Sequence, residues 1–288
     1  MIRQSFTPQQ IVESAIDFGA QIDPNTSINI LPTRRGSAAV VATDVGQWLM
    51  KYADLTVDAT EKGIEPARSV GIKNEAIHLG ELPLSLGPQL LHISNTTTSV
   101  CTAIEYIAGA SVHEITKGQA IKPYELVKNL IMSVSDLHES GILHGDIQPG
   151  NMLVDVNGKL RLLDFEFAHA LDEQAIAPGL YQYLSPQAAG EIVQGHLPTL
   201  DQQEETFALT MSSLAILSGA LPIARSSYTP SRHEMLLRLA DKPHYTTFSV
   251  SEENIPLARD LIGVLESDQY SRPTSPQELM GAIAVHLL

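Results

Sequence analysis

Apolar and polar residues form short alternating runs in the first third of the chain and follow a helical period in most of the rest. Between residues 27 and 55, three apolar runs separated by turn residues predict three antiparallel strands. A helix is predicted over 69–82, followed by strands over 89–95 and 100–107. Ahead of them, residues 7–22 carry apolar side chains at helical spacing after a Thr-Pro start, which predicts an amphipathic helix.

From residue 122 onward the apolar residues recur mainly at helical spacing. A helix is predicted over 122–140, and Gly141 just beyond it is a typical helix-terminating residue. An Asn-Gly pair at 157–158, between two apolar runs, predicts a hairpin of two short strands. A strongly apolar helix is predicted to end at Gly219, and the end of the chain is mostly helical.

The change of pattern predicts an α+β protein in three parts. Residues 1–26 are expected to form an N-terminal helical extension. Residues 27–108 are expected to form a small unit built on an antiparallel sheet with one helix, and residues 109–288 a mainly helical unit. A chain of 288 residues is long enough to give each of the two larger parts its own hydrophobic core.

The composition narrows the classes of function. With 18 basic and 33 acidic residues the formal net charge is −15, which argues against nucleic-acid binding through phosphate contacts. The same charge would favour a basic peptide or a cationic ligand as a partner, but most surplus carboxylates simply keep a protein soluble. Cys101 is the single cysteine, so no intrachain disulfide forms and a reducing, cytoplasmic location is expected. No stretch reads as a signal peptide or a membrane span, and the oligomeric state stays open.

A polar loop between two apolar stretches carries the candidate chemistry. The sequence ILHGDIQPGNMLV, residues 142–154, places Asp146 and Asn151 five positions apart. A carboxylate can orient a hydroxyl group and accept its proton, while an amide oxygen helps to hold a divalent metal. The predicted hairpin returns Asp164 beside Asn151 as a second oxygen ligand for Mg²⁺. Each residue alone fits a turn or a cap, but the three together favour a phosphoryl-transfer site.

HGDIQPGN followed by LLDFE resembles the catalytic loop and the metal-binding segment of the protein-kinase-like superfamily. The resemblance implies a two-lobed α+β fold that binds ATP and Mg²⁺. It implies that Asp146 is the catalytic base and that Asn151 and Asp164 are metal ligands. The motifs in their order cover roughly residues 27 to 288 of the sequence.

The same resemblance implies roles for residues in the first part of the chain. Lys51, in QWLMKYA, stands where the family's third-strand lysine holds the α- and β-phosphates, although such a lysine also fits an edge strand. Glu75, in KNEAIHL, matches the glutamate that pairs with this lysine. Glu65 and Glu81 are rival candidates for that partner.

Further segments match the family in the expected order. IEYIAGASV resembles the hinge, where backbone groups from Glu105 to Ile107 would meet adenine. PGLYQYLSPQ, residues 178–187, resembles the end of the activation segment, where a peptide substrate docks. Asp201 matches the family's structural aspartate, and Arg272 matches its late buried arginine.

The sequence departs from the family pattern in the phosphate loop and in the catalytic loop. LPTRRGSAAV offers only Gly36 in place of a glycine-rich loop, so backbone amides and Arg34 or Arg35 would have to cover the phosphates. Both arginines also fit a solvated turn. Gly145 replaces the arginine that docks a phosphorylated activation loop in regulated kinases, which argues against that kind of switch.

Three further departures change the charge of the site. Gln148, a candidate catalytic residue, replaces a lysine usually found near the γ-phosphate, and the lost charge should weaken transition-state stabilisation. Glu166 replaces the glycine of the usual DFG motif; it either adds a carboxylate to the metal site or faces solvent, and it restricts backbone flipping. Gln187 replaces a glutamate and should weaken the pairing with Arg272.

The leading interpretation is an enzyme that transfers the γ-phosphate of ATP to a Ser or Thr hydroxyl of a protein or peptide. His-Gly-Asp loops also occur in aminoglycoside-type phosphotransferases, so a small-molecule kinase is one alternative. Kinase domains of lanthipeptide synthetases resemble the same region. A pseudokinase that binds partners without turnover is a further alternative, favoured by the altered phosphate loop, Gln148 and Glu166.

Overall fold

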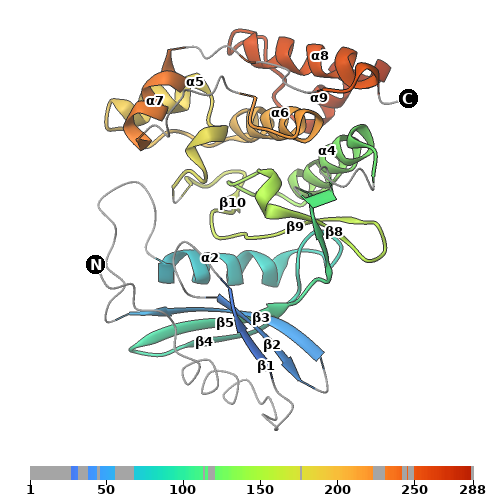
Figure 1. Cartoon of the computed structure of the whole chain (residues 1–288). Helices are drawn as coiled ribbons and strands as arrows, with labels where there is room; N and C mark the ends of the chain where they lie inside the picture. The colour runs from blue at the N-terminus through green and yellow to red at the C-terminus, as the bar shows by residue number, and fades with distance from the viewer. Residues whose placement is uncertain are drawn as a thin grey trace. The chain divides into compact units, whose positions relative to one another are not determined.

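The computed structural model of the chain forms two compact units, residues 1–108 and 109–288 (Figure 1). The predicted helix over 7–22 and the phosphate-loop residue Gly36 lie outside the residues that the structure describes. The described residues are 27–31, 38–43, 46–55, 68–112, 114–115, 121–175, 177–222, 231–241, 245 and 250–286.

The first unit is built on an antiparallel sheet with the strand order β1-β2-β3-β5-β4. The predicted strands are confirmed, as is the helix α2 between the third and fourth of them. Figure 1 shows α2 running along the sheet. The elements are β1 (Ser27–Ile30), β2 (Ala38–Thr43), β3 (Gly46–Asp54), α2 (Arg68–Glu81), β4 (Leu90–Asn95) and β5 (Ser99–Glu105).

Alternation along β3 gives the sheet two differently packed faces. Trp48 and Met50 point to one face, where they pack with Cys101 of β5 in a buried cluster. Cys101 is therefore a core residue, as its apolar surroundings predict. Ala53 points to the other face and packs in a second cluster with Ile72 of α2. The odd-numbered residues of β3 thus face the side that α2 covers.

The second unit is mainly helical, with short strands around the candidate loop. Its helices are α4 (Pro123–Glu139), α5 (Pro186–Val193), α6 (Gln202–Ser218), α7 (Arg232–Ala240), α8 (Ile255–Glu266) and α9 (Pro276–Ile283). Its strands are β6 (Gly109–Ser111), β7 (Ile142–Leu143), β8 (Met152–Asp155), β9 (Leu160–Leu162) and β10 (His169–Ala170). Among the described residues, no helix has the length and apolar character needed to cross a bilayer.

Helix α6 forms the centre of this unit, and α4, α8 and α9 pack against it. Almost all of its residues from Glu205 onward are buried, as the strongly apolar sequence predicts. It ends at Gly219, which takes the left-handed conformation with φ 66°. The hydroxyl of Ser212 donates to the carbonyl oxygen of Ile147 at 3.0 Å, so the helix holds the chain directly after Asp146.

The predicted hairpin is present as the antiparallel pair β8 and β9. Its turn has Gly158 at φ 80°, a conformation that favours glycine. The Asp155 carboxylate accepts from the backbone N–H groups of Asn157 and Lys159, both at 2.9 Å. These contacts fix the turn and therefore the positions of the two strand ends that flank the candidate site.

Candidate active site

In the first unit, Lys51 and Glu75 form a buried ion pair. Lys51 Nζ lies 2.8 Å from Glu75 Oε1, and the two side chains are only 7% and 0% exposed. Of the rival acids, Glu81 is exposed at the end of α2 and Glu65 lies outside the described residues. A paired cation on the sheet face that α2 covers agrees with the predicted phosphate-holding role for Lys51, which stays a prediction.

The residues predicted to form the hinge, Glu105 to Ile107, lie at the C-terminal end of the first unit. The backbone N–H of Glu105, at the end of β5, donates to the carbonyl oxygen of Gln89 at 2.8 Å. The Glu105 carboxylate accepts from Gln89 N at 3.1 Å. Ile107 follows in an extended stretch and is partly buried. The contribution of Glu105 and Ile107 to adenine binding remains a prediction.

In the second unit, His144 and Gly145 hold the candidate loop against the segment after β9. His144 Nδ1 accepts from the backbone N–H of Asp146, so Nε2 carries the proton and donates to Leu163 O at 2.9 Å. Gly145 has φ 74°, and a Cβ at this position would overlap the carbonyl group of Phe167. The close approach therefore explains why a glycine stands where regulated kinases have arginine.

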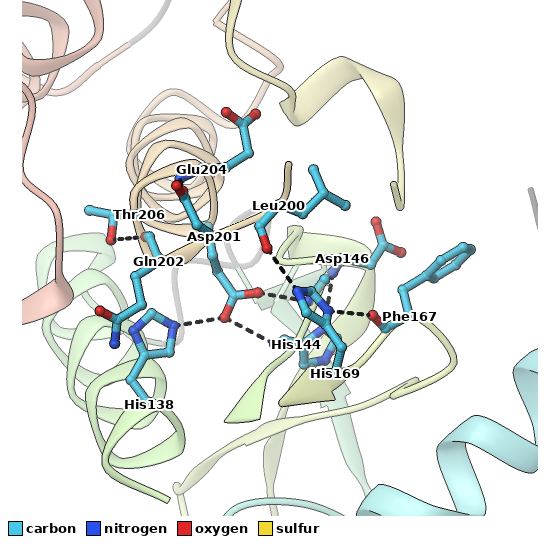
Figure 2. A network of polar contacts seen from close by, with 12 residues as sticks. His138, His144, Asp146, Phe167, His169, Leu200, Asp201, Gln202, Glu204 and Thr206 are labelled. Atoms are coloured by element: carbon cyan, nitrogen blue, oxygen red, sulfur yellow. Dashed lines mark hydrogen bonds and ion pairs between the residues drawn. The ribbon is translucent and has the colours of Figure 1, made fainter. Parts of the chain in front are cut away.

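Glu205 is the residue that anchors this loop to α6, whereas Asp201, which the resemblance matches to the family's structural aspartate, has a different contact. The Glu205 carboxylate accepts from His144 N at 3.0 Å and from Gly145 N at 2.6 Å. It also bonds His138 Nε2 of α4 at 2.9 Å, part of the network shown in Figure 2. Asp201 instead caps α6 by accepting from the backbone N–H of Glu204.

The charge of Glu205 is favoured by its contacts. Burial alone would raise the pKa of its carboxyl, but the hydrogen bond and charge of His138, together with His144, hold the pKa below its usual range. Because the pKa of Glu205 is lower in the folded state than in the unfolded state, the ionised carboxylate stabilises the fold near neutral pH. This stabilisation is lost as the pH falls below the pKa of the unfolded state and through the pKa of the folded state.

We expect Glu205→Gln to lower the free energy of unfolding by about 2–3 kcal/mol, because its amide group brings an N–H donor to a pocket of N–H donors. Urea unfolding at pH 7 measures the change. Asp201→Asn is the matched control, since asparagine caps a helix nearly as well as aspartate. Equal, small losses in both variants would contradict the anchoring role of Glu205.

Asp146 is held by N–H donors on both of its carboxylate oxygens. Oδ2 accepts from Gln148 Nε2 and from Asn151 Nδ2, each at 2.7 Å. Oδ1 accepts from the backbone N–H of Leu180 at 2.6 Å. A carboxylate offers about four lone pairs. One lone pair, on Oδ1, is therefore left to meet a hydroxyl group beside Leu180.

The surroundings of Asp146 also raise the basicity of its carboxylate, which suits the role of a proton acceptor. Burial raises the pKa of its carboxyl, and the charge of Asp164 adds to the rise. The Leu180 N–H, His144 and Gln148 act in the opposite direction, but the pKa stays above its usual value. A raised pKa makes the carboxylate a better base than an ordinary surface aspartate.

Gln148 and Asn151 both act on Asp146, and the orientation of Asn151 suits a metal ligand. Asn151 Nδ2 donates to the backbone oxygen of Asp146 at 3.0 Å as well as to its carboxylate. The amide oxygen of Asn151 is therefore turned away from Asp146. The Gln148 amide donates to the Asp146 carboxylate, so its predicted influence on catalysis would act through the orientation of Asp146.

The segment after β9 carries two further carboxylates. Leu163 N donates to Asn151 O at 2.9 Å, which brings this segment back to the candidate loop. Asp164 has φ 63°, a strained conformation for a residue other than glycine and one that is typical of functional sites. Glu166 is 3% exposed, so the solvent-facing alternative for this residue is wrong. Carboxylate oxygens of Asp164 and Glu166 lie within 4.8 Å of each other.

The oxygen donors of this unit fit a hard divalent cation. The Asn151 amide and the carboxylates of Asp164 and Glu166 are the kinds of ligand that Mg²⁺ takes, with water and phosphate oxygens completing the coordination. Their assignment as metal ligands stays a prediction. Phe165, between the two acids, is fully buried and packs on the His144 ring with the centroids 4.6 Å apart.

Two residues of the segment 178–187 complete the surroundings of Asp146, and sequence reasoning missed the role of both. Gly179 N donates to Gly145 O at 3.2 Å, and a Cβ on Gly179 would overlap the Asp146 carboxylate. Leu180 contributes only its backbone N–H. A glycine in a loop has many uses and a backbone donor is independent of residue type, so neither signal is visible in a single sequence.

Comparison with known proteins agrees with this geometry. A model described as "Protein kinase domain" matches residues 85–282, well over half of the chain. The chain therefore belongs to the protein kinase domain family, whose members generally use ATP and a divalent metal. Its α+β fold, with an antiparallel sheet in one unit and a mainly helical second unit, confirms the predicted fold class. The Lys51–Glu75 pair precedes the matched residues and is an independent observation.

Several relatives carry serine/threonine kinase names. The chain is 31% identical over 191 residues to "Serine/threonine-protein kinases drp72" of Corynebacterium efficiens, covering 63% of this chain and 34% of that protein. It is 30% identical over 128 residues to "Serine/threonine-protein kinase PrkC" of Bacillus subtilis, covering 41% and 19%. For "Serine/threonine-protein kinase pkn2" of Myxococcus xanthus the identity is 25% over 231 residues, covering 74% and 26%. The chain spans about a third or less of the length of these relatives.

Proposed function

We propose that this protein transfers the γ-phosphate of ATP to a Ser or Thr hydroxyl of a protein or peptide. The observation that carries the proposal is the state of Asp146: three N–H donors fix its carboxylate and leave one lone pair for an acceptor hydroxyl. The names of the relatives support a serine/threonine kinase.

In this proposal each residue of the second unit has one task. Asp146 orients the acceptor hydroxyl and takes its proton as the oxygen attacks the γ-phosphorus, while the bond from the γ-phosphorus to the β–γ bridging oxygen breaks and ADP leaves. Asn151 and Asp164 would hold Mg²⁺, with Glu166 as an additional carboxylate. The metal held there would supply positive charge to the phosphate oxygens. Gln148 keeps Asp146 in place through its 2.7 Å hydrogen bond.

The first unit would bind the nucleotide. Lys51, oriented by Glu75, would hold the α- and β-phosphates, and the backbone around Glu105 and Ile107 would meet adenine. Gly36 would lie in the phosphate loop. Lys51 is itself buried, and its 2.8 Å contact with Glu75 holds its ammonium group in place.

A protein or peptide acceptor is favoured over a small molecule because the segment 178–187 contacts the base directly. The Leu180 N–H reaches Asp146 Oδ1, so a chain docked on this segment would present its hydroxyl beside the open lone pair. The formal net charge of −15 favours basic sequences in that chain. The single buried Cys101 fits a reducing compartment, and we propose the cytoplasm as the place of action.

The test is ATP turnover by the purified protein with a basic Ser/Thr peptide pool, with Mg²⁺ and after its removal with a chelator. We expect turnover that needs the metal and places the label on Ser or Thr. Asp164→Asn should lower it about 100-fold or more, because one anionic ligand is lost. Label on a metabolite would support the small-molecule alternative. Nucleotide binding without turnover on any acceptor would support the pseudokinase alternative.

A further inference from the structure

One carboxylate on α6 holds the C-terminal end of the segment 178–187. The backbone N–H of Ser185 donates to Glu204 Oε1 at 2.6 Å, and Ser185 is 2% exposed. The hydroxyl of Ser185 accepts from Ala188 N at 3.2 Å and so caps α5. Ser185 therefore joins the segment, α5 and α6 at one point.

Glu204 and its neighbour Glu205 hold the two segments that meet at Asp146. The Glu205 carboxylate accepts from His144 N at 3.0 Å, two residues before the base, whereas Glu204 reaches the segment 178–187. Successive side chains of an α-helix point about 100° apart, which lets the two acids hold different segments. In Figure 2 the Glu204 carboxylate is turned away from the contacts around His144. One helix thus sets the position of the base and of the segment beside it.

The side chains that the family resemblance pairs near this point have other contacts. The Gln187 amide donates to Glu191 Oε1 along α5 at 3.4 Å. The Arg272 guanidinium donates to the carbonyl oxygen of Ser267 at 3.2 Å. The hydrogen bond that fixes the end of the segment therefore comes from Glu204, on another element.

The hold on Ser185 does not depend on the charge of Glu204. Burial raises the pKa of the Glu204 carboxyl to about 7, and the Asp201 charge adds to the rise, while the hydrogen bonds from Ser185 and the charge of Arg272 act in the opposite direction. The ionised and the protonated carboxyl each keep an oxygen lone pair for the Ser185 N–H. The contact is therefore available on both sides of neutral pH.

We propose that Glu204 is a positioning residue for the acceptor peptide: by holding Ser185, it keeps the segment 178–187 where a docked peptide meets the open lone pair of Asp146. A polar cavity of about 80 Å³ lies beside Glu204. Without the carboxylate, water in this cavity would compete for the Ser185 N–H, and the end of the segment would be free to shift. As far as the segment receives the acceptor, this inference rests on the proposed function.

The contact is tested by following the Ser185 amide by NMR in the full chain at pH 7. In Glu204→Ala we expect its protection from hydrogen exchange to fall about tenfold to 100-fold, because the hydrogen-bond acceptor is lost. Glu204→Gln keeps an oxygen acceptor and should retain most of the protection. Glu191→Ala, which removes another carboxylate from the lining of the same cavity, is the matched control and should leave the protection of this amide close to wild type.

A second measurement separates positioning from a general loss of structure. In the proposed kinase reaction, Glu204→Ala should raise the KM for the acceptor peptide about tenfold and leave the KM for ATP unchanged, and Glu204→Gln should restore the acceptor KM. Destabilisation alone would lower the amount of active enzyme and would change neither KM. Glu204→Asp keeps the carboxylate but is one methylene group shorter; it should lose part of the Ser185 protection, and it replaces Glu204→Ala if that variant does not fold.

A Ser185 amide that is as well protected in the shortened variant as in the wild type overturns the inference. An acceptor KM that stays at the wild-type value in that variant overturns it as well. Because the NMR readout needs no turnover, absence of kinase activity in the wild type would refute the proposed function alone, while the Ser185 amide still decides whether Glu204 holds the segment.

Discussion

Replacement of Asp146 by asparagine is expected to lower phosphoryl transfer about 100-fold to 10,000-fold, the range that a general base contributes. The amide cannot accept the acceptor proton. It also has one oxygen to share between the Leu180 N–H on one side and the Gln148 and Asn151 amides on the other. Steady-state turnover with the labelled peptide measures the loss.

Two comparisons keep this result interpretable. ATP affinity should survive in Asp146→Asn, because the residue belongs to the acceptor side of the proposed reaction. Asp155→Asn, in the β8–β9 turn of the same unit, removes a hydrogen-bonded carboxylate away from the chemistry and should leave turnover close to wild type. Wild-type turnover in Asp146→Asn would mean that the loop 142–154 is scaffolding.

The second large effect is expected at the ion pair of the first unit. Lys51→Met should lower the free energy of unfolding by about 3–5 kcal/mol, because it leaves the fully buried Glu75 carboxylate without its cation. ATP binding should be lost with it. Urea unfolding followed by ellipticity measures the stability, and nucleotide titration measures the binding.

The double variant Lys51→Met/Glu75→Leu separates stability from binding. Replacing both charges with apolar side chains also removes the buried carboxylate, so most of the lost stability should return. ATP binding should stay absent. Lys73→Met, on α2, is the matched control and should change the stability by no more than about 0.5 kcal/mol. A double variant as unstable as Lys51→Met would show that the pair itself, rather than an orphaned charge, stabilises the unit.

Structural features that depend on a few neighbouring residues, such as a turn or the alternation along a strand, were predictable from the sequence. The Asn-Gly pair at 157–158 specified the turn that returns the chain to Asn151, because glycine readily adopts the positive φ that the turn needs at residue 158. Alternation along β3 placed Lys51 opposite the buried Trp48 and Met50. These signals depend on backbone conformation and on a two-residue period, both of which a single sequence contains.

The anchor of the candidate loop was not predictable in the same way. Asp201 and Glu205 lie one helical turn apart at the start of α6, and both are acids near the expected position. Aspartate directly before a helix is a strongly preferred cap, and the structure uses Asp201 for that task. The choice of Glu205 depends on how deep α6 lies beneath His144 and Gly145, which is a property of tertiary packing.

Contacts between segments that lie far apart in the chain could also not be predicted from the sequence. Gln187 signals that a carboxylate is missing, but nothing local indicates that Glu204 holds Ser185. The close packing of Gly179 on Asp146 depends on where the segment 178–187 returns to the loop. In each case the residue type permits the contact, and only the fold selects it.

The position of the only tryptophan has a practical consequence for following these effects. Trp48 is 6% exposed in the core of the first unit, three positions before Lys51 on the same strand. Its intrinsic fluorescence therefore reports the unfolding of that unit, while the second unit contributes no tryptophan emission. Excitation at the red edge of indole absorption, compared with ellipticity from the helices, reveals whether the two units unfold together or in sequence. The protein thus contains its own optical probe for the first unit, with no label attached.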